Sequence, residues 1–274
     1  MLKDMTLGQF FPGNSVIHRL DARVKLLAAI VYIVTIFLAN NEWCYLALAV
    51  SAMLLIALSR LSFKVILKGL KPVLFVLIFT ALINLFVTKG ETQLVDFYFI
   101  HIYYEGIVRA VKMALRVVVL VIGTSVLLTY TTSPIVLTDA IESLLSPLKV
   151  IRVPVHDFAM MMTIALRFIP TLVEETEKIM NAQKARGADF ETGGLISRAR
   201  ALVPVLIPLF VSSFNRADEL AVAMECRCYR GDKGRTRFVR MRLRASDIVI
   251  FILFALFLTA IVLGNIYLPY HLPV

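Results

Sequence analysis

Side chains that could carry out catalysis are few and scattered in this 274-residue chain. The four histidines are far apart in sequence: His18, His101, His156 and His271. No His-Glu-x-x-His, no Gly-x-Ser-x-Gly and no glycine-rich phosphate loop followed by Lys and Ser or Thr occurs. We therefore predict that the chain is not an enzyme and holds no cofactor, so that any ATP must be hydrolysed by another chain.

Three cysteines also argue against a disulfide or a metal centre. Their number is odd, and Cys226 and Cys228 are only two residues apart, a spacing that rarely meets the geometry of a bridge. The pair could form half of a thiolate metal site, but no further Cys or His lies near it in sequence to complete four ligands. We expect reduced thiols, Cys44 included, and no metal.

Two arginines occupy similar places in the sequence. Arg186 stands in Ala-Gln-Lys-Ala-Arg-Gly and Arg227 in Ala-Met-Glu-Cys-Arg-Cys, and Gly187 and Gly231 can stop a helix just beyond them. In a structural interpretation each arginine compensates a helix dipole and contributes ~0.3–1 kcal/mol. In a functional one, each guanidinium fork binds carboxylates in an acidic groove of a soluble partner. Two such ends would fit a partner with two similar subunits, and the sequence leaves both interpretations open.

The elements that carry these arginines are two long helices with an apolar first half and a charged second half. The first is predicted from about residue 156 to 186, a length of ~45 Å, with a kink at Pro170. The second is predicted from about residue 195 to 227, and its apolar run, 201–211, is too short to span a bilayer. One end of each helix belongs in apolar surroundings and the other in water.

Three consecutive methionines begin the first of these helices: Met160, Met161 and Met162. Such residues usually lie in a core or face lipid. The alternative is that unbranched, polarizable methionine provides an adaptable surface for exchangeable membrane partners. We keep them as candidate contacts for such a partner.

The rest of the chain is dominated by apolar stretches. Hydrophobic residues make up 59% and charged residues 18% of it, whereas a soluble domain carries about a quarter charged residues. Five stretches approach the ~20 residues that cross a hydrocarbon layer: about 24–39, 43–58, 72–87, 115–130 and 248–266. The predicted fold is therefore an all-α integral membrane protein with about five transmembrane helices and long amphipathic cytoplasmic helices.

Charge sets the expected orientation and domain limits. Lys3, Arg19, Arg23 and Lys25 precede the first span and four more basic residues follow the second, so the N-terminus should be cytoplasmic. We divide the chain into a membrane domain (1–131), a cytoplasmic helical region (132–245) and a last span with its tail (246–274). The basic residues near the start of the fourth span fit this orientation poorly: Arg109, Lys112 and Arg116.

A basic run lies between the second long helix and the last span: Arg230, Lys233, Arg235, Arg237, Arg240 and Arg242. Nucleic-acid binding would require a stacking platform or recognition fold, and neither pattern accompanies the run. An anchor on anionic lipid headgroups, which also orients the last span, is the simpler interpretation. We predict contact with the bilayer and none with nucleic acid.

Four short stretches together resemble a known family: Leu20–Leu27, Leu144–Leu148, Ala165–Pro170 and Ala182–Gly187. Their order, and the spans around them, are similar to the transmembrane (T) component of energy-coupling factor (ECF) transporters. The resemblance covers most of the chain. It implies a scaffold in the cell membrane that joins two cytoplasmic ABC-type ATPases, which bind ATP and Mg²⁺, to a membrane-embedded substrate-binding S component for vitamin or metal-ion uptake.

The resemblance also implies which residues dock the ATPases. They would be Ala185, Arg186 and Gly187 at the first helix end, and Cys226, Arg227 and Cys228 at the second, where both flanks depart from the family's Ala-Arg-Gly. Substrate recognition would belong to the S component. From a different class, the chain could instead be a membrane anchor whose basic face recruits an acidic cytoplasmic partner.

Overall fold

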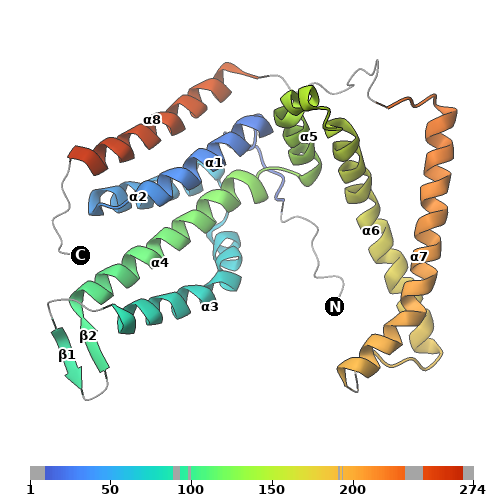
Figure 1. Ribbon diagram of the computed structural model, residues 1–274, viewed down its shortest axis with the longest axis horizontal. Helices are drawn as coiled ribbons and strands as arrows, with labels where there is room; N and C mark the ends of the chain where they lie inside the picture. Colours follow the sequence, from blue (N-terminus) through green and yellow to red (C-terminus); the bar gives the residue numbers. More distant parts are fainter. Residues whose placement is uncertain are drawn as a thin grey trace. The chain divides into compact units, whose positions relative to one another are not determined.

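The computed structural model describes residues 10–88, 93–97, 100–190, 192, 194–231 and 243–267. Most of the basic run after Arg230, together with Lys3 and His271, lies outside these described residues. Within them, the structure is predominantly helical (Figure 1). The predicted all-α membrane fold is confirmed.

Within the described residues, eight α-helices follow one another in this order: α1 (Ala22–Leu38), α2 (Glu42–Ser59), α3 (Phe63–Val87), α4 (Tyr104–Thr124), α5 (Pro134–Leu145), α6 (Val155–Ala185), α7 (Leu195–Cys226) and α8 (Ala245–Tyr267). A π-helical turn, Ser125–Thr129, extends α4, and a 3-10 turn, Ser146–Ile151, follows α5. The sequence did not predict the short antiparallel hairpin between α3 and α4, formed by β1 (Gln93–Phe97) and β2 (Ile100–Tyr103).

In the part of the chain that the structure describes, five helices are long and apolar enough to cross a membrane: α2, α3, α4 with its π-helical turn, α7 and α8. Two of these assignments differ from the predicted spans. The first predicted span, α1, has 17 residues, about 25 Å, which is shorter than a typical crossing. The other is α7, which the sequence placed in the cytoplasm; length and composition alone make it a candidate span.

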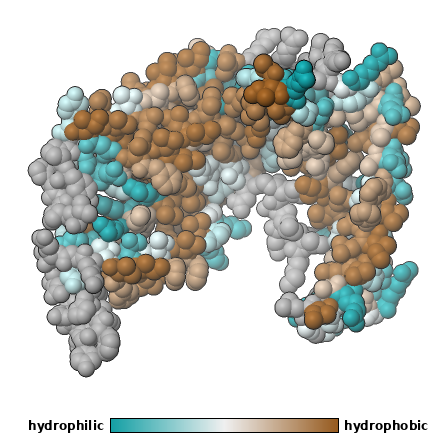
Figure 2. Space-filling view, viewed as in Figure 1, coloured by the Kyte–Doolittle hydropathy of each residue, from teal (hydrophilic) through white to brown (hydrophobic). Residues whose placement is uncertain are grey.

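The described residues form two compact units. The first, here called the membrane unit, comprises residues 10–140 and 243–267, and the second, the crossed-helix unit, comprises residues 141–231. The membrane unit contains α1, α2, α3, α4 and α8, and apolar side chains make up much of its visible face, with hydrophilic side chains between them (Figure 2). The crossed-helix unit contains α6 and α7, which carry the two candidate arginines. The division into membrane and cytoplasmic regions at residues 131 and 245 remains a prediction.

Tyr32 marks the centre of the membrane unit, where four helices meet. Its ring is 1% exposed, lies edge-on to Phe254 of α8 at 6.1 Å, and its hydroxyl is 3.0 Å from the Ser51 hydroxyl of α2. Gly123 of α4 makes this possible, because a Cβ there would lie 2.0 Å from a ring carbon of Tyr32. The approach of α1 to α4 thus depends on a missing side chain.

The basic residues of α4 lie beside the turn between α1 and α2. One Nη atom of Arg116 donates to the carbonyl of Ala39, at 2.7 Å, and to the hydroxyl of Tyr45, at 2.6 Å. Nζ of Lys112 lies 3.5 Å from a carboxylate oxygen of Glu42. A carbonyl at a helix C-terminus lacks an intrahelical donor, so a cation is favourable there. These contacts give two of the three charges a structural role, which the sequence did not predict.

Candidate functional site

The crossed-helix unit consists mainly of two antiparallel helices. α6 begins after Pro154 and has Asp157 in its first turn, where a negative charge favours the helix dipole, and α7 begins after Gly194. Both predicted helices are confirmed. Each contains proline, which removes a backbone hydrogen bond and permits a bend. In Figure 1 the two helices run in opposite directions and cross.

The crossing is held by one carboxylate. One oxygen of Glu175 on α6 accepts a short hydrogen bond from the hydroxyl of Ser212 on α7, and the other accepts from an Nη atom of Arg216 at 2.7 Å. Ser212 and Arg216 are one helical turn apart, so they point to the same side of α7. Sequence analysis missed this site, because the partners are 37 and 41 residues apart and follow no local pattern.

Both candidate arginines lie where their helix ends. Arg186 follows the last residue of α6, Ala185, and Arg227 follows the last residue of α7, Cys226. Because the helices are antiparallel, the two arginines lie at opposite ends of the crossed pair (Figure 1). The structure therefore does not bring the two predicted sites together, but presents them separately.

The two helix ends share one backbone turn. At the first, the N–H of Gly187 donates to the carbonyl of Lys184 at 3.0 Å, and that of Ala188 to Gln183 at 3.0 Å. At the second, the equivalent bonds run from Cys228 to Glu225 at 2.8 Å and from Tyr229 to Met224 at 3.0 Å. This is the Schellman pattern, which requires a left-handed residue just after the cap. Gly187 has φ +88° and Cys228 has φ +56°. The weak sequence repeat therefore corresponds to a shared geometry.

All six predicted docking residues are exposed: Ala185, Arg186, Gly187, Cys226, Arg227 and Cys228. A Cβ built on Gly187 would meet no atom within 4 Å. Among the described residues, no carboxylate pairs with the guanidinium of Arg186 or Arg227. Each end thus presents an unoccupied cationic fork flanked by small residues, which is suited to entering a groove.

Substitution at the left-handed position should affect the two ends in opposite directions. Gly187→Ala should weaken the end of α6 and Cys228→Gly should strengthen that of α7, each by about 1 kcal/mol, because a Cβ disfavours this conformation. Hydrogen exchange at the amides of Ala188 and Tyr229, which close the turns, measures both effects. Shifts in the same direction would contradict the shared geometry.

The methionines lie at the opposite end of α6 from Arg186. Met160 lines a cleft of about 590 Å³ together with Met224, Arg227 and residues up to Gly231, so the structure brings it close to the second docking end. Met161 and Met162 are exposed. This neighbourhood could not be found from sequence, since it depends on the antiparallel packing of α6 and α7.

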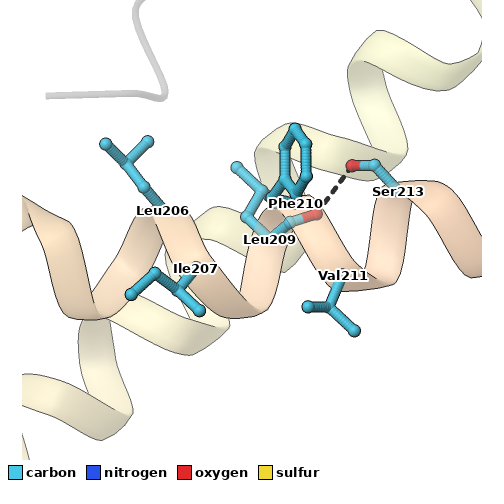
Figure 3. A pocket seen from close by; sticks show the side chains of 6 residues that line it. All are labelled: Leu206, Ile207, Leu209, Phe210, Val211 and Ser213. Atoms are coloured by element: carbon cyan, nitrogen blue, oxygen red, sulfur yellow. Dashed lines mark hydrogen bonds between the residues drawn. The ribbon is translucent and has the colours of Figure 1, made fainter.

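A shallow apolar groove lies on α7 at the middle of the helix (Figure 3). It has a volume of about 490 Å³, and its lining residues are Leu206, Ile207, Leu209, Phe210, Val211 and Ser213. Ser213 supplies the one polar side chain of this lining, and its hydroxyl donates to the carbonyl of Leu209 at 2.7 Å. The groove offers contact to an apolar partner or to lipid and no group for catalysis. Within the described part of the chain, no three His, Cys, Asp or Glu side chains gather as metal ligands.

Comparisons with known proteins cover nearly the whole chain. The family model described as "CbiQ: Cobalt transport protein" matches residues 13–238. "Energy-coupling factor transporter transmembrane protein EcfT" of Ruminiclostridium cellulolyticum is 52% identical over 263 residues, which cover 96% of this chain and 98% of the relative. The protein of the same name from Acidaminococcus fermentans is 56% identical over 237 residues, 86% and 88% of the two chains. That of Bacillus subtilis is 45% identical over 247 residues, 90% and 93%.

These matches extend across both units and include both candidate arginines, which lie inside the matched range 13–238. The identities are far above those at which only a fold is shared, and nearly the whole length of each relative is covered. The resemblance drawn from four short stretches is thereby confirmed. The chain belongs to the family of multi-pass transmembrane components of energy-coupling factor transporters.

Proposed function

We propose that this chain is the scaffold that links two cytoplasmic ATPase subunits to a membrane-embedded S component. The observation that carries the proposal is the pair of equivalent helix ends, each presenting an exposed arginine, at opposite ends of one crossed pair. A single partner groove would need one such end. Two equivalent ends suit two similar subunits.

The spacing of the ends supports two separate docking sites. Arg186 lies 11 residues beyond Glu175, and Arg227 lies 15 residues beyond Ser212, distances of roughly 16 and 22 Å along the helices. Because the directions are opposite, the arginines can be up to ~40 Å apart. That separation is too large for one groove and is comparable to the diameter of a small domain. Rigid helices of this length can transmit a displacement from one end to the other.

We assign the contact with the S component to the apolar surfaces of α6 and α7. The groove around Phe210 is exposed and lined by large apolar side chains, and Met161 and Met162 add a flexible apolar surface. Exposed apolar surface of this kind is stable only against lipid or an apolar protein face. The N-terminus and the docking ends would lie on the cytoplasmic side, where the ATPases bind ATP and Mg²⁺.

Substrate recognition would lie in the S component and not in this chain. Among the described residues, no three His, Cys, Asp or Glu side chains gather as metal ligands, and the groove around Phe210 is lined almost entirely by apolar side chains. Within this proposal the chain supplies coupling and no catalytic group. Uptake of a vitamin or a transition-metal ion is the expected activity of the assembled complex.

Purification of the complex tests this function. The tagged chain, expressed with its neighbouring genes and isolated in mild detergent, should carry two ABC-type ATPase polypeptides and a small membrane protein, identified by mass spectrometry. Isolation of the chain alone would contradict the scaffold. An acidic soluble protein bound to its basic face in place of the ATPases would favour the membrane-anchor alternative.

The Glu175 crossing should be needed for coupling. Glu175→Gln removes the ion pair with Arg216, and we expect it to lower uptake per ATP hydrolysed about 3- to 10-fold while both ATPases stay bound, because the helices can then shift at their crossing. The double variant Glu175→Arg/Arg216→Glu should restore much of the ratio. Glu174→Gln is the matched control, because the neighbouring carboxylate is exposed. Equal losses in all three variants would show that the crossing pair has no special part.

A further inference from the structure

Lys25 is buried within the membrane unit in spite of its charge. Lys25 is 2% exposed, although the sequence pattern predicted that it would be one of the exposed cytoplasmic charges that flank the first span. Nζ donates to three oxygens: the carbonyl of Thr131 at 2.9 Å, the hydroxyl of Thr132 at 3.2 Å and the carbonyl of His18 at 3.3 Å. All three protons of the ammonium group thus have an acceptor, which is the condition for burying a charge at tolerable cost.

A buried carboxylate, Asp247, lies close enough to Lys25 to act on its charge and contacts the start of α1. Asp247, at the start of α8, is 1% exposed. One of its oxygens accepts from the backbone N–H of Asp21 at 3.1 Å and the other from the N–H of Arg244 at 2.7 Å. Asp21 in turn caps α1, because its side chain accepts from the N–H of Arg23 at 2.9 Å. The segment Leu20–Lys25 therefore contacts two distant parts of the chain.

Those two parts are the places where the chain leaves and re-enters the membrane unit. Thr131 and Thr132 stand just before α5, within which the chain passes into the crossed-helix unit at residue 141. Arg244 and Asp247 follow directly after the chain returns at residue 241. The N-terminal segment adds a third tie to the first connection, since the N–H of Phe11 donates to the carbonyl of Tyr130 at 3.0 Å.

Burying a lysine costs desolvation free energy, so its buried position calls for a physical explanation. An apolar side chain of similar volume often stabilises a fold as well or better, but it fixes no particular set of partners. The ammonium group lies at the C-terminal end of the long helix formed by α4 and its π-helical turn, where carbonyls lack donors and a cation is favourable. The Lys25 ammonium group keeps all three hydrogen bonds only when α1 stays next to Thr131 and Thr132 and to the carbonyl of His18.

We propose that Lys25, together with Asp21 and Asp247, is a positioning cluster for energy coupling. It fixes to α1 the described residues that precede and follow the crossed-helix unit, Thr131–Thr132 and Arg244–Asp247, so that these two points of the membrane unit hold their places when the crossed helices are displaced. The proposal rests on the coupling function proposed above. The cluster contacts neither ATP nor substrate and acts only through the two connections.

The test uses the full chain in nanodiscs and a closely matched pair of threonine variants. Thr132→Val removes the hydroxyl that Lys25 contacts, whereas Thr131→Val removes a hydroxyl that bonds only to the carbonyl of Leu127, four residues earlier. Hydrogen exchange followed by mass spectrometry should become roughly tenfold faster for residues 130–133 in Thr132→Val and stay unchanged in Thr131→Val. Lys25→Met should extend the faster exchange to residues 244–247.

Transport by the assembled complex supplies the second readout. Radiolabelled B vitamins, Co²⁺ and Ni²⁺ serve as probes, and the probe that the wild-type complex accumulates is then used for the variants. Uptake per ATP hydrolysed should fall about 3- to 10-fold in Thr132→Val, with the amount of bound ATPase unchanged. The proposal is overturned if exchange at residues 130–133 is unaffected by Thr132→Val, or if the same variant speeds exchange equally throughout α1 and α8. If the wild-type chain binds no ATPase, the scaffold function is contradicted instead. The hydrogen-exchange result on the Lys25 cluster would still stand.

Discussion

The double variant Arg186→Ala/Arg227→Ala is expected to lose both ATPase subunits during purification. Each guanidinium group is exposed at a helix end. Truncation to alanine of an arginine that fills a partner's groove typically lowers the binding free energy by at least ~2 kcal/mol. Because the two ends are far apart, their losses should add, which corresponds to a drop of about 1,000-fold in affinity. The measurement is the amount of ATPase retained per mole of the chain in detergent.

Three further variants show whether the loss depends on the charge, on the planar guanidinium group or on any exposed arginine. Arg186→Lys and Arg227→Lys keep the charge but lose the planar fork, and each should recover only part of the binding. Arg198→Ala, an exposed arginine near the start of α7, should bind like wild type. Retention of both ATPases by the double alanine variant would leave the two arginines with the structural role of compensating helix dipoles.

Gly123→Ala is expected to destabilise the membrane unit strongly. The new methyl group would lie 2.0 Å from a ring carbon of Tyr32, which is buried between α1, α2, α4 and α8 and cannot swing aside. Overpacking of this kind costs about 1–3 kcal/mol, and the melting temperature should fall by roughly 5–10 °C. Thermal unfolding of the chain in detergent provides the measurement.

Gly264→Ala is the matched control for this substitution. It is also a glycine within a transmembrane helix, but its Cβ would make an ordinary contact, 3.6 Å from Sγ of Cys44. Alanine there should be neutral or slightly stabilising, because it favours the helix over glycine. Tyr32→Val should partly rescue Gly123→Ala by making room. A melting temperature unchanged by Gly123→Ala would show that α1 and α4 are less closely packed than described.

The sequence predicted features that depend on local patterns. The ends of α6 and α7 follow from a long mixed helix that stops near a glycine, and both were placed within about two residues. Cys228 was missed as a left-handed residue, because cysteine has no intrinsic preference for that conformation. The sequence did not predict that α7 is long and apolar enough to be a candidate span, because its uninterrupted apolar run, 201–211, is short and further apolar residues lie beyond it among charged ones.

Features that depend on tertiary contacts were out of reach. Lys25 reads as a flanking charge because only its partners at Thr131 and Thr132, more than 100 residues away, show that it is buried. Glu175 likewise looks like one of several charges on a solvated helix face until α7 crosses it. In both places a local rule, that charged side chains are exposed, is overruled by a satisfied polar cluster.

Site-specific photo-crosslinking tests the central claim most directly. p-Benzoylphenylalanine is placed at Ala185 in one variant and at Cys226 in another, next to the two arginines, and the complex is irradiated in membranes. The scaffold predicts that each position crosslinks to an ATPase subunit, and that mutation of the adjacent arginine abolishes the product. Crosslinks from either position to lipid or to this chain alone would contradict the docking of two ATPases at the two helix ends.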